Sequence, residues 1–188
     1  MRALATILVL AATGPALAQD LSYNYLELTY SWTEIDAGFA DVDGDGFGFK
    51  GSLEVGDMWH IFAGIGQADL DQGVDYDQIV IGGGLHTPIA PNMSLYLDLA
   101  YINVDAAGPG GSFDDDGLGT ELGLRMWAMP QLEVRGALSY TDLGDSDAQT
   151  GIEGAAWYEF SRNFAAGFGI GFTDDTSEYG LGLRYYFE

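Results

Sequence analysis

The sequence GFGFKGSLEVG, residues 46–56, decides the fold because the character of its side chains alternates with a period of two. One set of alternate positions holds Phe47, Phe49, Gly51, Leu53 and Val55, and the other holds Gly48, Lys50, Ser52, Glu54 and Gly56. Alternate side chains of a β-strand point to opposite faces, so this strand has one apolar face and one polar face. A wall between lipid and a polar lumen needs this pattern, and lipid admits such strands only in a closed barrel without unpaired edges.

The same alternation recurs along the chain and predicts an all-β fold, a transmembrane up-and-down antiparallel β-barrel of ten strands, with eight strands as the alternative. The predicted strands are 22–34, 46–56, 58–69, 77–87, 93–104, 117–128, 131–141, 149–159, 164–173 and 179–187. The connections after even-numbered strands are short, and those after odd-numbered strands are longer and acidic. Short turns are typical of the periplasmic side, so the sequence predicts acidic extracellular loops.

The first residues have the pattern of an export signal. Arg2 is positively charged, residues 3–12 are apolar, and Ala16-Leu17-Ala18 is a small-residue cleavage site. We therefore expect residues 1–18 to be a cleaved signal peptide and residues 19–188 to form one outer-membrane barrel domain. The sequence contains 0 cysteines, which excludes disulfides and thiolate metal sites.

The charge of the chain is strongly negative, with 29 acidic residues and a formal net charge of −23 that becomes −24 when Arg2 is removed with the signal. This balance predicts no nucleic-acid partner. Four of the remaining bases fall on lumen-facing positions: Lys50, Arg125, Arg135 and Arg184. Acidic residues share that parity: Glu27, Glu54, Asp98, Glu121, Glu133, Glu153 and Glu159. A cation facing lipid costs about 2–4 kcal/mol at the midplane, so we expect a lumen charge network.

Within this network, Glu121 and Arg125 lie on the same face as Glu133 and Arg135 of the next predicted strand. We expect these two pairs to form a ladder that braces the barrel wall. Satisfied interior ion pairs are the favoured interpretation, and a catalytic or gating role is the alternative.

The only two histidines, His60 and His86, have lumen parity on neighbouring predicted strands near the short turns. No G-x-S-x-G nucleophile motif occurs, and neither histidine is near the rim where surface substrates would arrive, so we expect no enzymatic activity. The favoured interpretation is a packed histidine pair bonded across the strands. A pH-sensitive or weakly metal-binding pair is the alternative.

Residues 41–46 read DVDGDG and match the opening half of an EF-hand calcium loop, with Asp41, Asp43 and Asp45 as candidate Ca²⁺ ligands. The second half of the motif is absent, because the twelfth position is Ser52 rather than a bidentate Glu. We therefore expect no dedicated cofactor, and at most weak Ca²⁺ binding shared among acidic segments.

Several stretches resemble a family of small proteobacterial outer-membrane β-barrels: residues 21–25 (LSYNY), residues 43–47 (DGDGF), residues 82–84 (GGG) and the aromatic C-terminus. The family includes OmpA/OmpX-type and porin-like barrels and members described as quorum-factor-like. The resemblance implies the barrel fold and the Gram-negative outer membrane as location. We expect membrane lipid and lipopolysaccharide as partners. The last strand also resembles the signal read by the barrel-assembly machinery, although Glu188 follows the terminal aromatic Phe187.

Two functional classes remain open for a monomeric barrel of this kind. The first is a structural or surface-interaction protein, and the alternative is a narrow channel, a small porin for ions or small polar solutes. Bulky lumen residues favour an occluded or very narrow lumen: Tyr23, Tyr25, Phe62, Tyr96, Trp127, Trp157 and Tyr186. Glycines leave one wall bare, and we expect Tyr23 and Tyr25 to cover those of the last strand.

Overall fold

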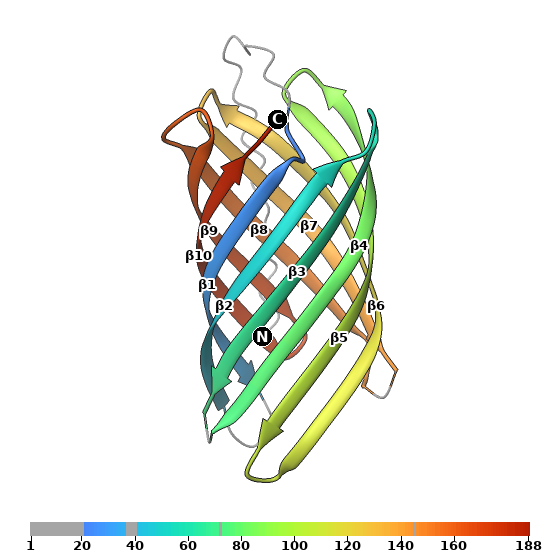
Figure 1. Cartoon of the computed structure of the whole chain (residues 1–188), viewed down its shortest axis with the longest axis vertical. Helices are drawn as coiled ribbons and strands as arrows, with labels where there is room; N and C mark the ends of the chain where they lie inside the picture. The colour runs from blue at the N-terminus through green and yellow to red at the C-terminus, as the bar shows by residue number, and fades with distance from the viewer. Residues whose placement is uncertain (1–20, 37–40, 72, 145) are drawn as a thin grey trace, which may run out of the picture.

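The computed structural model describes residues 21–36, 41–71, 73–144 and 146–188 (Figure 1). Ten strands make up its regular structure: β1 (Tyr25–Asp36), β2 (Asp41–Glu54), β3 (Trp59–Leu70), β4 (Val74–Ala90), β5 (Met93–Gly108), β6 (Gly111–Met129), β7 (Leu132–Leu143), β8 (Gln149–Glu159), β9 (Phe164–Thr173) and β10 (Thr176–Tyr186). In the part of the chain described, no helix is long and apolar enough to cross a membrane. The predicted signal peptide, residues 1–18, lies outside the described residues.

Each strand pairs antiparallel with its neighbours in sequence, and β1 also pairs with β10, which closes the barrel. The closing seam runs from Tyr25 opposite Tyr186 to Ile35 opposite Thr176. Figure 1 shows the strands inclined to the long axis of the barrel, as closure of a sheet requires. The prediction of a ten-stranded up-and-down barrel is confirmed.

The barrel has two different ends. The terminal end, uppermost in Figure 1, holds the C-terminal end of β10 and the connections 55–58, 91–92, 130–131 and 160–163. The distal end holds residues 71, 73, 109–110, 144, 146–148 and 174–175, which connect its strands. The β5–β6 hairpin projects furthest at this end (Figure 1).

The prediction of long acidic loops at the distal end is wrong in one respect, since most of the residues concerned are in strands. The predicted loop 105–116 is strand except for residues 109–110, and Asp41, Asp43 and Asp45 belong to β2. Ladder hydrogen bonds hold two strands together whether or not one face is apolar. The strands therefore continue past the end of the apolar pattern that the sequence prediction followed.

The two faces of the barrel wall have opposite character. Outward positions carry large apolar side chains such as Leu28, Phe47, Ile65 and Leu138, and Phe47 is 62% exposed. Buried side chains face the lumen, and they include aromatic, basic and acidic residues together. An apolar surface this extensive is typical of a protein surrounded by lipid.

Candidate functional site: the barrel lumen

The most buried charged side chain in the described part of the lumen is Glu133 of β7, which is 1% exposed. Arg125 of β6 binds it with two parallel hydrogen bonds, from Nε to Oε1 at 2.8 Å and from Nη2 to Oε2 at 2.9 Å. The Tyr186 hydroxyl donates to Glu133 Oε2 at 3.1 Å, and Arg184 Nη1 lies 3.4 Å from Oε1. Glu133 is thus satisfied by side chains from two other strands, β6 and β10, as a buried carboxylate requires.

Arg184 of β10 extends this cluster across the closing seam. It lies opposite Glu27 of β1 and donates to Glu27 Oε2 from Nε at 2.9 Å and from Nη2 at 2.6 Å. Its guanidinium carbon lies 4.0 Å from the ring centre of Trp157 and 4.4 Å from that of Tyr25. Ion pairs and cation–π contacts therefore hold the same guanidinium. We call Glu27, Arg125, Glu133 and Arg184, with these rings, the charged layer.

A second ion-pair group lies nearer the distal end. Arg135 of β7 bonds Glu121 of β6, the Tyr96 hydroxyl also bonds Glu121, and Arg135 Nη2 lies 3.3 Å from Glu153 Oε2. Its side chains are partly exposed, at 20% for Arg135, 18% for Glu121 and 38% for Glu153. Water therefore reaches this group, whereas Arg125, Glu133 and Arg184 of the charged layer are at most 5% exposed.

The two strands β6 and β7 do carry a ladder, but its partners differ from those predicted. Arg125 lies directly opposite Arg135, and each pairs with an acid of the other strand: Arg125 with Glu133, and Arg135 with Glu121. Glu121 and Arg125 are four residues apart on one strand, which places their Cα atoms about 13 Å apart. Pairs across the strands are closer, so they form instead.

The two histidines meet near the terminal end. His60 Nδ1 of β3 lies 3.2 Å from His86 Nδ1 of β4, so one imidazole donates and the other accepts. His60 Nε2 lies 3.0 Å from Asp98 Oδ1 of β5. Gly84 is opposite both His60 and Asp98, and a side chain at this position would collide with both. All three side chains have lumen parity in the sequence, but parity does not reveal the contact that Gly84 permits.

Residues Ser22–Asn24, which precede β1, cross the terminal mouth of the lumen, and we call them the terminal strap. The Tyr23 ring stacks on the His86 ring, and their centres are 4.0 Å apart. The Arg125 guanidinium carbon lies 4.3 Å from the centre of the Tyr23 ring. Arg125 Nη2 donates to the Ser22 carbonyl at 3.0 Å, and the Tyr23 hydroxyl lies 3.2 Å from Ser94 Oγ. Tyr23 is only 3% exposed.

The strap is also tied to β2 through Glu54. The Tyr23 amide donates to Glu54 Oε1 at 3.0 Å, and the Glu54 amide donates to Asn24 Oδ1 at 2.7 Å. Together with the contacts to Arg125 and Ser94, these bonds connect the strap to β2, β5 and β6. The expectation that Tyr23 and Tyr25 cover the glycines of the last strand is therefore wrong, because Tyr23 is held by the histidines and Tyr25 lies against Arg184.

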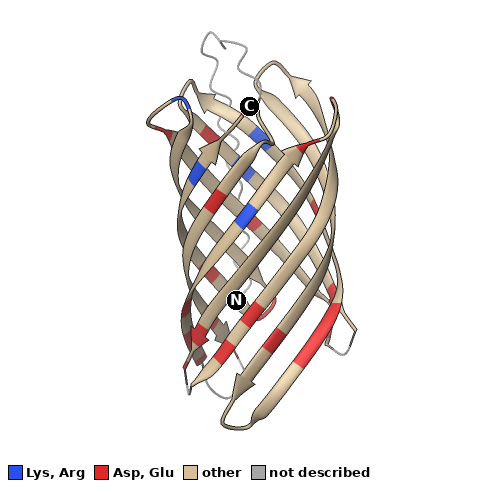
Figure 2. Cartoon of the chain, viewed as in Figure 1, with Lys and Arg blue, Asp and Glu red and all other residues tan. Residues whose placement is uncertain are grey.

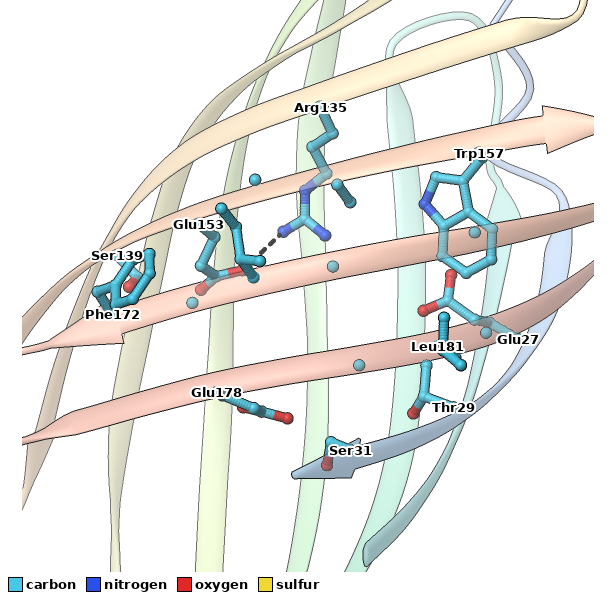
Figure 3. Close-up of a pocket in the computed structure, with 18 of the residues that line it drawn as sticks. Glu27, Thr29, Ser31, Arg135, Ser139, Glu153, Trp157, Phe172, Glu178 and Leu181 are labelled. Atoms are coloured by element: carbon cyan, nitrogen blue, oxygen red, sulfur yellow. Dashed lines mark hydrogen bonds and ion pairs between the residues drawn. The ribbon is translucent and has the colours of Figure 1, made fainter. Parts of the chain in front are cut away.

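Trp157 of β8 covers those glycines instead. A Cβ atom added at Gly167 of β9 or at Gly182 of β10 would collide with its indole ring. Beyond the ring, toward the distal end, a cavity of about 260 Å³ opens between β1 and β7–β10 (Figure 3). We call it the distal cavity. A second cavity, of about 330 Å³, lies at the terminal end beside Tyr23, His86 and Glu54.

Of the remaining candidates, Lys50 of β2 lies opposite Glu27 of the charged layer. Lys50 Nζ is 4.7 Å from the ring centre of Phe62, and Glu159 lies opposite Ala165 near the terminal end. Asp41, Asp43 and Asp45 lie on the outer face of an extended strand, where they cannot wrap around one ion as an EF-hand loop does. Among the described residues, no group of three or more His, Cys, Asp or Glu could hold a metal ion.

Charge is unevenly distributed along the barrel axis. Figure 2 shows Lys and Arg residues toward the terminal end and many Asp and Glu residues at the distal end. The interior cations all have aromatic or acidic neighbours in the lumen. The barrel therefore changes from a mixed-charge terminal end to an acidic distal end, where carboxylates such as Glu34, Asp43 and Asp77 lie on the outer face.

Residues 4–187 match the family described as the outer membrane protein β-barrel domain. The chain belongs to this family. No curated protein matches the sequence.

Among solved structures, an outer-membrane channel from Pseudomonas putida F1 aligns with a TM-score of 0.56 at 9% identity, covering 93% of this chain and 99% of that one. The KdgM porin in complex with disordered oligogalacturonate aligns with a TM-score of 0.52 at 10% identity, covering 86% and 99%. The NanC porin aligns with a TM-score of 0.52 at 7% identity, covering 86% and 100%. Similarities this distant show the fold alone.

Membership of the family shows what surrounds the outer surface of the barrel. The protein is an outer-membrane β-barrel, so its outward apolar side chains face lipid. Outward aromatic rings gather near both ends of the apolar zone, with Tyr30 4.8 Å from Trp32 toward the distal end and Phe164 5.0 Å from Tyr185 toward the terminal end. Two such rings of aromatic residues are typical of barrels whose amphipathic side chains sit at the lipid headgroups.

Proposed function

We propose that this protein is a non-enzymatic outer-membrane barrel, closed to free diffusion, with a structural or surface-interaction role. The observation that carries the proposal is the charged layer together with the terminal strap. Arg125, Glu133 and Arg184 have side chains no more than 5% exposed, and Tyr23 is 3% exposed. Opening a path through this region would separate buried charges from their partners, which is costly in a dry interior.

The orientation of the barrel gives the distal end its role. In outer-membrane barrels the chain termini lie on the periplasmic side, so we place the terminal end in the periplasm and the acidic distal end outside the cell. There the acidic strand ends would meet the cation-rich surface of lipopolysaccharide. The closed sheet has no free edge for a second copy, which supports a monomer. We also assign the aromatic C-terminal strand to recognition by the barrel-assembly machinery.

A test of orientation uses single cysteines in a chain that has 0 cysteines of its own. Asp147→Cys in the connection 144–148 should react with an impermeant thiol reagent on intact cells, and Asp57→Cys in the connection 55–58 should not. Labelling of Asp57→Cys in unbroken cells would reverse the orientation.

A narrow channel is the second candidate, and two observations favour it. Cavities of about 260 Å³ and about 330 Å³ lie on the two sides of the charged layer, and the solved structures with a similar fold include proteins named as porins and channels. The distal cavity is lined by three carboxylates and one guanidinium. A channel built on this lumen would therefore pass cations better than anions.

Single-channel conductance separates the two candidates. The refolded protein in a planar bilayer should give no stable conductance steps, whereas an open porin reconstituted in the same bilayer should give them. Regular steps from the unmodified barrel, at a conductance that scales with salt, would establish the channel instead.

A further inference from the structure

The floor of the distal cavity is formed by glycines that packing does not require. A Cβ atom added at Gly169 would have only the Gly154 carbonyl oxygen nearby, at 3.8 Å, and one added at Gly171 would meet only side-chain carbons at 3.9 Å. Both are ordinary van der Waals distances, so alanine would fit at either position. Glycine weakens a strand and often marks a site where a ligand approaches the backbone closely. The space above Gly169 and Gly171 therefore calls for an occupant other than a neighbouring side chain.

A buried hydrogen-bond donor lines the same cavity. Trp157 is 4% exposed, and its Nε1 has no acceptor within the part of the chain that the structure describes. Figure 3 shows the nitrogen on the side of the indole that faces Arg135 and Glu153. Burying an N–H group without a partner is unfavourable, so a ligand oxygen placed here would relieve that cost.

The charges around the cavity select the sign of the ligand. Glu27, Glu153 and Glu178 line it, and among the described residues Arg135 is its one lining cation. Arg135 is engaged with Glu121, and its contact with Glu153 is long, at 3.3 Å. The Glu153 side chain is 38% exposed. Glu27 is already paired with Arg184, and Arg135 with Glu121, so Glu153 and Glu178 carry the remaining charge and the cavity attracts a cation and repels an anion.

Hydroxyl groups complete the wall, from Thr29 and Ser31 of β1 and Ser139 of β7 (Figure 3). Hydroxyls both donate and accept hydrogen bonds, so they suit a ligand that is itself rich in hydroxyl groups. The volume of about 260 Å³ falls just below the range of about 300–1,000 Å³ typical of sites for drug-sized molecules. A ligand the size of one sugar ring fits this limit.

We propose that the distal cavity binds a small hydroxylated amine of hexosamine size. The ammonium group pairs with Glu153 and Glu178, a ring or hydroxyl oxygen accepts from Trp157 Nε1, and the C–H face of the ring lies over Gly169 and Gly171. This site does not require the barrel to conduct, nor does it depend on which end faces the cell exterior.

The test is a calorimetric titration of the refolded full chain in detergent with glucosamine, and with glucose and glucuronate as neutral and anionic controls of similar size. Glucosamine should bind at least tenfold more tightly than glucose, and glucuronate should not bind detectably. Equal binding of glucosamine and glucose would remove the role of the carboxylates, and tighter binding of glucuronate would make the cavity an anion site. Absence of glucosamine binding would overturn the proposal.

Three variants locate the site. Gly169→Leu fills the cavity and should abolish binding, and Glu153→Gln should reduce the preference for glucosamine over glucose at least fivefold. Trp157→Phe keeps a ring over the glycines but removes the N–H group, and should weaken both sugars. Gly66→Leu is the matched control. Gly66 faces the lumen, and a Cβ atom added there would have as much room as one at Gly169, but Gly66 does not line the cavity. Equal loss of binding in Gly169→Leu and Gly66→Leu, both folded by heat-modifiable gel mobility, would place the ligand elsewhere.

Discussion

The two halves of the lumen stabilise their interior charges in different ways. In the terminal half, Arg125, Glu133 and Arg184 are almost completely buried, and each has charged partners from another strand. In the distal half, Arg135 and Glu153 are partly exposed, and much of the wall is glycine. Charged groups withdrawn from water need complete sets of partners, whereas charges that water reaches do not.

The difference shows how a barrel of one strand number can be packed at one level and open at another. Trp157 lies at the boundary, with Arg184 over its ring on one side and Gly167 and Gly182 against it on the other. Backbone spacing is the same throughout the wall, so side-chain volume alone decides where the lumen closes. Substitutions on either side of this boundary should therefore have unequal effects.

The largest effect should come from Arg125→Met. It leaves Glu133 buried beside fewer positive charges, and breaking such a pair costs about 3–5 kcal/mol of folding free energy. Arg135→Met removes a partly exposed cation from the other half and should cost about 1–2 kcal/mol, because water compensates Glu121 and Glu153. The temperature at which the folded band disappears in heat-modifiable gel electrophoresis measures both.

Two controls sharpen that comparison. Arg162→Met, in the exposed connection 160–163, should leave the midpoint unchanged. The double variant Arg125→Met/Glu133→Met should recover part of the loss, because Arg184 keeps Glu27 as its partner. Equal losses from Arg125→Met and Arg135→Met would show that the two halves are equally accessible to water.

Tyr23→Ala should have the next largest effect, because it removes the ring that stacks on His86 and lies under Arg125. Truncating a buried aromatic side chain costs about 3 kcal/mol. The same variant should give conductance steps that the unmodified protein lacks, since the strap closes the terminal mouth. Tyr158→Ala, on the outer face, is the control that should stay silent. A stable and silent Tyr23→Ala barrel would mean that the strap is not the closure.

A smaller difference should separate two glycines on one face of β9. Gly167→Ala places a methyl group into the Trp157 ring and close to the Ala156 carbonyl oxygen, so overpacking should cost about 1–3 kcal/mol. Gly169→Ala meets no close neighbour and should be neutral or slightly stabilising. Thermal midpoints of the two variants compare the packed and open sides of the boundary directly. Equal midpoints would show that Trp157 moves aside without cost.

The smallest effect should be that of calcium on the acidic strand ends. Asp45 of β2 lies opposite Asp69 of β3, and Asp69 lies opposite Asp75 of β4. Like charges placed directly opposite repel each other, so weakly bound Ca²⁺ should stabilise the barrel by about 1 kcal/mol at concentrations about fivefold above its dissociation constant. We expect that constant to be on the order of 10⁻⁴–10⁻³ M.

The calcium comparison needs a monovalent salt at matched ionic strength, because screening also relieves repulsion. The triple variant Asp41→Asn/Asp43→Asn/Asp45→Asn should lose part of the calcium-specific rise in thermal midpoint. If sodium chloride reproduces the whole rise in thermal midpoint, these residues form only a solvated acidic surface.

The sequence alone predicted the closed antiparallel barrel of ten strands, with eight as the alternative, and the lumen parity of its interior charges. These follow from a period of two, which is a local property that a single strand displays without its neighbours. Parity alone also assigned His60, Asp98, Arg125 and Glu133 to the lumen, where all four are buried. The prediction of a loop at residues 105–116 was wrong, because the strands continue after the apolar pattern has ended.

Only the tertiary structure decided which interior groups meet. Parity assigns a side chain to the lumen but carries no information about its height along the axis or its partner across the barrel. Register and strand inclination set those, and they paired Arg125 with Glu133 and brought Tyr23 onto His86. The packed half and the open half of the lumen result from these contacts, because closure requires side chains from several strands to reach the same level, which depends on the whole barrel at once.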